Sequence, residues 1–129
     1  MIALDTNVLV RYLTRDEPEE AARARSLIER GPVFVAKTVM LETEWVLRSA
    51  YRFRPAAIAA SFTAFLGLPG VTVEDASAVG RALAWYAQGL DFADALHAAS
   101  CAQADAFATF DRRLRRRAEL AGMMPVIAP

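Results

Sequence analysis

Hydrophobic residues along this chain fall into two kinds of pattern, which alternate from one end to the other. Short apolar runs bounded by turn residues predict five strands, at residues 1–4, 33–37, 71–74, 106–110 and 125–128. Longer segments with apolar residues at helical spacing predict seven helices, at residues 6–14, 17–30, 39–53, 55–68, 76–88, 91–104 and 112–121. This alternation predicts an α/β protein, a three-layer α/β/α sandwich with a central parallel sheet of about four to five strands.

Proline, glycine and threonine mark the predicted helix ends. Pro18 lies in the first turn of the helix at 17–30, and Gly31-Pro32 ends that helix. Thr38 is expected to cap the helix at 39–53, and Pro55 is expected to close it. The 129 residues show no repeat or linker, so we expect one domain.

Two aspartates follow predicted strands. Asp5 ends the first apolar run, and Asp111 ends the segment FATFD. If these strands are neighbours, both carboxylates lie at the edge where parallel sheets place their ligand sites. Thr109 shares a face of its strand with Asp111. The alternative for either aspartate alone is that its side chain only caps the following helix.

The helix predicted at residues 39–53 carries two glutamates with different surroundings. At about 100° per residue, Glu42 lies beside Val39 and Val46 at the edge of the apolar stripe, so we expect it to face inward. Glu44 lies on the opposite side, four residues before Arg48, where the two form a favourable surface pair. We therefore interpret Glu44 as structural and Glu42 as a candidate functional residue.

The helix predicted at residues 91–104 is apolar on nearly all sides, which makes its acidic residues unusual. Asp91, with Asp94 three residues later, resembles a capping box and therefore has a purely structural alternative. Asp94 lies further into the helix, where a carboxylate needs more compensation than a helix dipole supplies. His97 and Cys101 have a spacing that permits metal binding, but the chain has no second histidine or cysteine, and packing explains them better.

The candidate site is thus formed by Asp5, Glu42, Asp94 and Asp111. Two unit charges about 4 Å apart repel by about 4 kcal/mol at an effective dielectric constant of about 20. Four clustered carboxylates would then offset much of the roughly 5–15 kcal/mol that stabilises a domain. Either some of them are protonated or a divalent cation lies among them, and an all-oxygen ligand set selects Mg²⁺ or Mn²⁺ over zinc.

Charge and hydropathy bear on the possible ligands of the chain and on its cellular location. The net charge is zero, but 14 of the 15 basic residues are arginine, and five of these lie between residues 112 and 117. Arginine suits bidentate phosphate binding, with a solvated helix face as the alternative. Pro69-Gly70 interrupts the uncharged segment 55–73, leaving it too short to span a bilayer, and no secretory signal is visible. We expect a cytoplasmic protein without membrane contact.

Four segments that contain these acids resemble the acidic blocks of PIN-domain ribonucleases, most closely those of the VapC toxins of bacterial toxin–antitoxin pairs. The segments are IALDTNVLVRYL, TVMLETEWVLRSAY, LDFADALHAA and FATFDRRL, in this order along the chain. The resemblance implies a single PIN domain over residues 1–129. It also implies that four acids are catalytic and bind metal: Asp5, Glu42, Asp94 and Asp111.

The same resemblance implies roles for neighbouring residues. Asp91 becomes a further candidate metal ligand. Three small polar residues would orient the acids or a metal-bound water, namely Thr6, Asn7 and Thr109. The arginines that follow Asp111 would hold flanking phosphates, namely Arg112, Arg113, Arg115 and Arg116, with Arg11 and Arg15 as weaker candidates.

The implied activity is hydrolysis of RNA phosphodiesters with one or two Mg²⁺ or Mn²⁺ ions. The implied partners are a second copy of the chain, as a homodimer, and a VapB-like antitoxin that blocks the acidic cleft. The apolar segments around Phe62, Phe65, Trp85 and Tyr86 are candidates for either contact, with core packing as the alternative.

Two other functions match part of the pattern. One is a non-catalytic PIN-like module that binds RNA or a protein without cutting. The other is a phosphatase with Asp5 as covalent nucleophile, similar to haloacid-dehalogenase-like enzymes. Those enzymes have a second aspartate two residues later, where this chain has Asn7, and its only lysine is Lys37.

Overall fold

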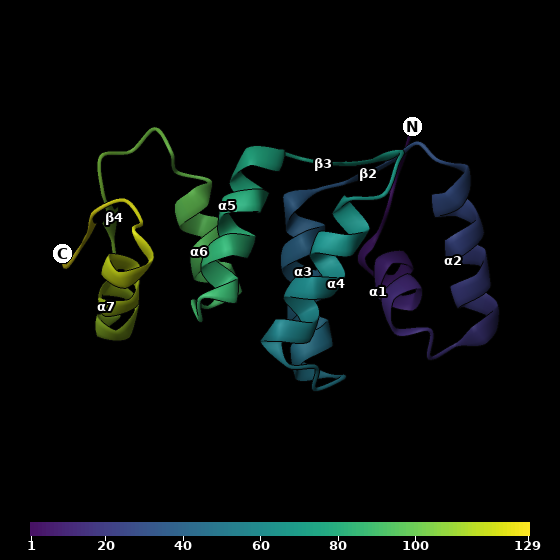
Figure 1. Ribbon diagram of the computed structural model, residues 1–129, viewed down its shortest axis with the longest axis horizontal. Coiled ribbons are helices and arrows are strands. Elements are labelled where there is room, and N and C mark those ends of the chain that lie inside the picture. Colours follow the sequence, from purple (N-terminus) through teal and green to yellow (C-terminus); the bar gives the residue numbers. More distant parts are fainter. The chain divides into compact units, whose positions relative to one another are not determined.

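The computed structural model describes residues 1–129, which form seven helices and five strands (Figure 1). The chain forms two compact units, residues 1–76 and 77–129. The first contains β1 (Ile2–Ala3), α1 (Thr6–Thr14), α2 (Pro18–Arg30), β2 (Val33–Val35), α3 (Lys37–Ser49), α4 (Pro55–Leu66) and β3 (Val71–Val73). From the unit boundary onward follow α5 (Ala76–Ala87), α6 (Phe92–Ala99), β4 (Phe107–Ala108), α7 (Arg112–Ala121) and β5 (Val126–Ile127).

The three strands of the first unit form one parallel sheet in the order β1-β2-β3. Ile2 is opposite Val33, and Val33 is in turn opposite Val71. Helix α1 packs against α2 and α3, and α3 packs against α4 (Figure 1). Because the strands are parallel, their carboxyl ends share one edge of the sheet. Both α1 and α3 begin at this edge, directly after β1 and β2.

Local sequence explains the ends of α2. Pro18 occupies its first position, and the Glu17 side chain accepts hydrogen bonds from the backbone N–H groups of Glu19 and Glu20, at 3.4 and 2.7 Å. Gly31 ends the helix with a φ of 34°, a conformation that favours glycine.

Helix α3 begins and ends earlier than the sequence predicts. It starts at Lys37 after Ala36, so Thr38 lies within the helix and does not cap it. It ends at Ser49, because the chain leaves the helical conformation before Arg52, whose φ is 58°. Pro55 does not close α3; it opens α4, where a missing backbone N–H has no cost.

The buried face of α3 differs from the one expected from its apolar residues. The buried residues are Met40, Thr43, Glu44 and Leu47, which follow helical spacing. Glu44 is only 2% exposed, and its carboxylate accepts a hydrogen bond from Arg48 Nε at 2.8 Å. The predicted pairing with Arg48 is therefore confirmed, but its predicted place on the surface is wrong. Polar residues can occupy the buried face of a helix when a hydrogen-bond partner is available. The spacing of apolar residues alone does not reveal such buried polar positions.

Thr43 offers a test of packing on this face. Its hydroxyl is fully buried and has no hydrogen-bond partner. An unsatisfied buried hydroxyl costs about 1–3 kcal/mol, so Thr43→Val, which keeps the shape and removes the polar atom, should stabilise the protein by about 1 kcal/mol. The measurement is urea unfolding. Thr43→Ala is the control and should destabilise, because it also leaves a cavity. A valine variant less stable than wild type would show that the hydroxyl has a partner in solution.

The second unit consists of α5, α6 and α7 with the parallel pair β4 and β5. Alanine-rich faces of α5 and α6 are buried, and Tyr86 packs edge-on against Phe92 with ring centroids 5.2 Å apart. Helix α6 ends at Ala99, five residues before the predicted end. The N–H of Cys101 bonds to Ala98 O, only three residues back, and the polar segment that follows is exposed.

The α/β fold class is confirmed, and all five predicted strands are present, three in one parallel sheet and two in a second parallel sheet. Phe62, Phe65 and Tyr86 are buried core residues, which confirms the packing alternative for them and excludes them from surface contacts. No helix combines the length and apolar character needed to cross a bilayer. A direct pairing of β1 with β4 concerns strands in different units and stays a prediction.

Candidate active site

Asp5 follows β1 and stands at the N-cap position of α1. Its backbone carbonyl accepts the first helical hydrogen bonds, from Val8 N at 3.1 Å and Leu9 N at 3.3 Å. Its exposed carboxylate, however, makes no capping hydrogen bond. The structural alternative, in which Asp5 serves as a helix cap, is therefore wrong for its side chain. The position at the carboxyl edge of the sheet leaves this carboxylate available for a ligand.

Glu42 is joined to the residue after Asp5. The hydroxyl of Thr6, which is buried, donates a short hydrogen bond to Glu42 Oε1. Glu42 is exposed, so the expectation that it faces inward is wrong; Glu44 is the inward glutamate of α3. The Thr6 contact nevertheless places Glu42 beside the start of α1. Asp5, Thr6 and Glu42 form the part of the candidate site that belongs to the first unit.

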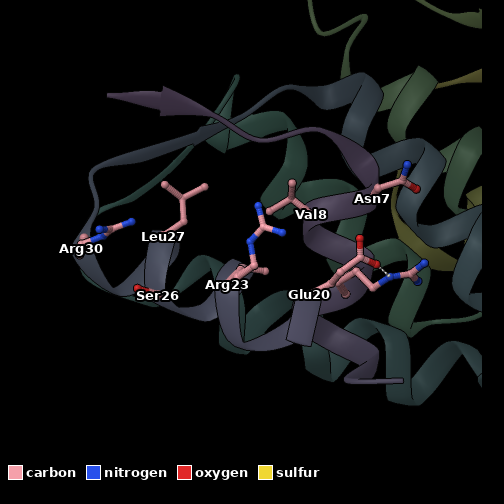
Figure 2. A pocket seen from close by; sticks show the side chains of 9 residues that line it. Asn7, Val8, Glu20, Arg23, Ser26, Leu27 and Arg30 are labelled. Carbon is pink, nitrogen blue, oxygen red and sulfur yellow. Dashed lines mark hydrogen bonds and ion pairs between the residues drawn. The ribbon is translucent and has the colours of Figure 1, made fainter. Parts of the chain in front are cut away.

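Asn7 is exposed, and its side chain projects outward from helix α1 (Figure 2). Its side chain lines a pocket between α1 and α2. Arg11 and Arg15 follow on α1. Arg11 is bound by Glu20 and Asp16, whereas Arg15 is exposed at the C-terminal end of the helix.

Asp91 and Asp94 belong to the second unit. Asp91 is the N-cap of α6, and its Oδ2 accepts a hydrogen bond from Asp94 N at 3.1 Å, which confirms the predicted cap. Burial raises the pKa of the Asp94 carboxyl above its ordinary value. The negative charges of Asp91 and Asp111 raise this pKa further, against an opposing effect of His97. Asp91 and Asp111 of this unit therefore both act electrostatically on Asp94.

Asp111 caps α7 through one oxygen. Its Oδ1 accepts hydrogen bonds from the backbone N–H groups of Arg113 and Leu114, at 2.9 and 3.1 Å. The capping alternative is thus confirmed, but Oδ2 has no part in it. The Thr109 hydroxyl accepts a hydrogen bond from Asp111 N at 3.1 Å and so holds the backbone of this aspartate in place. Because both capping hydrogen bonds use Oδ1, capping leaves Oδ2 free for a ligand, and the two predicted roles are compatible.

The arginines of α7 lie around a narrow buried stripe formed by Leu114 and Ala118. Arg115 donates to Thr109 O at 3.3 Å, and Arg117 donates to Gly89 O. Arg112, Arg113 and Arg116 are exposed. The helix therefore presents several guanidinium groups to solvent immediately after Asp111.

The acids of the candidate site are not neutralised by arginine or lysine. The ion pairs involve other carboxylates, those of Asp16, Glu20, Glu29, Glu44 and Asp75. A carboxylate whose pKa is raised by burial and by two neighbouring carboxylates, in an all-oxygen set without an arginine or lysine partner, fits a hard divalent cation. Neither unit by itself brings together three metal-binding side chains. The joint site of Asp5, Glu42, Asp94 and Asp111 spans both units and stays a prediction.

A family model described as the PIN domain matches residues 2–120. The chain belongs to the PIN domain family. No curated protein matches it significantly. PIN domains are generally metal-dependent nucleases that bind divalent cations such as Mg²⁺, so the family supplies a nuclease fold for these acids.

Two further cations of this PIN domain lie outside the set of residues predicted above. Arg23 and Arg30 of α2 line the same pocket as Asn7. The sequence does contain a signal for them, because residues seven apart share one face of a helix. The sequence does not show that α1 lies opposite that face of α2. This arrangement is visible only in the structure.

Proposed function

We propose that this PIN domain is a metal-dependent endoribonuclease and the toxin of a VapBC-type toxin–antitoxin pair, acting in the cytoplasm. The observation that carries the proposal is the family match over nearly the whole chain, together with acids that lack cationic partners. We further propose that residues 1–129 act as one PIN domain. The four family-like blocks, which occur in order along both units, support this.

Asp5, Glu42, Asp94 and Asp111 would hold one or two Mg²⁺ or Mn²⁺ ions, with Asp91 as an additional ligand. When bound, such an ion lowers the pKa of a water and stabilises negative charge on a phosphate. Thr6 fixes the Glu42 carboxylate by its hydrogen bond, and Thr109 fixes the backbone of Asp111. These contacts pre-orient two of the acids. Asp94 or Asp111 positions the attacking water and accepts its proton.

The arginines of α7 are proposed to bind RNA phosphates on either side of the cleaved bond, through Arg112, Arg113, Arg115 and Arg116. Exposure of three of them and their place directly after Asp111 support this role. The guanidinium of Arg115 also contacts Thr109 O, so this residue has a structural contact in addition.

A homodimer and a VapB-like antitoxin are the proposed partners. Large apolar side chains that remain exposed are available for such contacts, namely Trp45, Phe110 and Leu120. They replace the buried Phe62, Phe65 and Tyr86 as candidates.

Incubation with total RNA tests the nuclease function. With Mn²⁺ or Mg²⁺ present, the purified protein should produce discrete new RNA ends, because a fixed acidic site selects its cleavage position. Excess chelator should reduce the rate by at least about 100-fold, since the metal supplies most of the charge stabilisation. Sequencing of the new ends identifies the substrate. Cleavage that persists in chelator would contradict a metal-dependent mechanism.

A non-catalytic module that binds RNA or protein is the second candidate, and a thermal shift separates the two. A cation present at about 100 times its dissociation constant stabilises the folded state by about 2.7 kcal/mol. The nuclease should therefore unfold at a higher temperature with Mn²⁺ than with the same concentration of Na⁺. Absence of a shift, together with intact RNA, would favour the binding module.

A further inference from the structure

A pocket of about 500 Å³ lies between α1 and α2, within the first unit (Figure 2). Val8, Ala24 and Leu27 supply its apolar surface. Polar and charged side chains form the remainder of the lining, namely Asn7, Arg11, Glu20, Arg23, Ser26 and Arg30. The pocket therefore combines an apolar floor with groups that bind anions.

The lining of the pocket has more positive than negative side chains, three arginines against one glutamate. Arg11 is neutralised by Glu20, at 2.8 Å, and by Asp16, at 3.4 Å, and these acids raise the pKa of its guanidinium further. Arg23 and Arg30 are exposed and take no part in the ion pairs of the chain. Two guanidinium groups thus face the pocket without a carboxylate partner. Each presents the planar fork that suits bidentate binding of a phosphate.

The two cations are arranged along one line. They are seven residues apart on α2, which corresponds to two helical turns and about 10 Å along its axis. Figure 2 shows Arg23 directed toward Val8 of α1, with Leu27 between Arg23 and Arg30. Asn7 lies at the opposite end from Arg30. Because Asn7 is two residues after Asp5 in the chain, that end of the pocket lies at the start of α1, the helix that Asp5 precedes.

We propose that this pocket binds a single-stranded RNA segment next to the cleaved bond, with Arg23 and Arg30 each holding one phosphate. This inference rests on the proposed nuclease function. A ligand that reaches from Asp5 past Asn7 to both arginines needs anionic groups at regular intervals, as a polynucleotide has. Between the phosphates, the apolar surface at Val8 and Leu27 accommodates a base or ribose, and the Ser26 hydroxyl offers a hydrogen bond.

Binding of a fluorescein-labelled 12-nucleotide RNA, measured by anisotropy in excess chelator, tests the pocket without any need for catalysis. Arg23→Ala with Arg30→Ala should raise the Kd by about tenfold. It should also lower the slope of log Kd against log salt by about 1.4, or 0.7 for each lost phosphate contact. The matched control is Arg25→Ala, on the same helix but paired with Glu29 and outside the pocket, and its Kd should stay within twofold of wild type. Thermal unfolding checks that all variants are folded.

Cleavage with Mn²⁺ separates this inference from the nuclease function. A dinucleoside monophosphate, whose only phosphate is the one that is cleaved, should be cut equally by wild type and the double variant, whereas the 12-mer should show a raised KM in the variant. An unchanged Kd and KM for the 12-mer, with cleavage intact, would overturn the pocket alone. The pocket would also be reassigned to a protein ligand if wild type binds a glutamate-rich peptide, the double variant does not, and both bind the 12-mer with the same Kd. If wild type binds the 12-mer through these arginines but never cuts it, the nuclease function fails and the pocket stands.

Discussion

Asp5→Asn should abolish RNA cleavage while leaving the protein folded. The carboxylate is exposed, makes no capping hydrogen bond and has no cationic partner, so its loss removes no contact that supports the fold. As a metal ligand, however, it should matter more than the groups that merely orient ligands, whose loss typically costs about 10- to 100-fold in activity. We therefore expect the initial rate with Mn²⁺ to fall by more than about 100-fold.

Asp105→Asn is the matched control for this experiment. Asp105 is an exposed aspartate that lies outside the predicted site, so the same chemical change there should leave the rate within twofold of wild type. Circular dichroism and the unfolding temperature establish that both variants are folded. If Asp5→Asn cuts RNA at the rate of Asp105→Asn, then Asp5 is not a ligand of the catalytic metal.

The arrangement of strands and helices was largely predictable, because it depends on local patterns. The helices at α1 and α7 have the predicted bounds, and the five apolar runs all form strands, each paired in parallel within its own unit. The errors occur where tertiary contacts override local signals. Thr38 has the chemistry of a cap, but α3 starts two residues earlier than predicted because the chain enters it directly from β2.

The two glutamates of α3 show why the site was harder to predict than the fold. Apolar periodicity placed Glu42 inside and Glu44 outside, and the structure reverses both. The sequence alone does not distinguish a glutamate that will be buried from one that will be exposed. A glutamate can be buried where a cationic partner compensates its charge, as Arg48 does for Glu44. What connects Glu42 to Asp5 is the Thr6 hydroxyl, 36 residues away in sequence. Only the packing of α1 on α3 reveals this contact.

Asp94→Asn should have opposite effects on activity and stability. As a proposed metal ligand, Asp94 is needed for cleavage, so the rate should again fall by more than about 100-fold, beyond the loss of an orienting group. In metal-free protein the same carboxylate opposes folding. Burial and the charges of Asp91 and Asp111 raise its pKa in the folded state above the unfolded value of about 3.9.

The sign of the stability effect follows from this shift. A group with a raised folded pKa stabilises the folded state below its unfolded pKa, and this contribution is lost as the pH rises through the folded pKa. At pH 7 and in chelator, Asp94→Asn should therefore unfold at a higher temperature than wild type. Near pH 3, where Asp94 is protonated in both states, the difference should vanish. Added Mn²⁺ should stabilise wild type but not the variant.

Asp16→Asn provides a control with the reverse sign. Hydrogen bonds from Tyr51 at 2.6 Å and Thr14 at 2.9 Å lower the pKa of Asp16, and Arg11 lowers it further. Its contribution is present above the unfolded pKa and lost as the pH falls, so this variant should be slightly less stable than wild type at pH 7. A gain for Asp94→Asn beside a loss for Asp16→Asn would separate a carboxylate retained for function from one retained for stability. A loss of stability in both variants would show that the Asp94 carboxylate stabilises the metal-free protein, which contradicts the sign expected from its raised pKa.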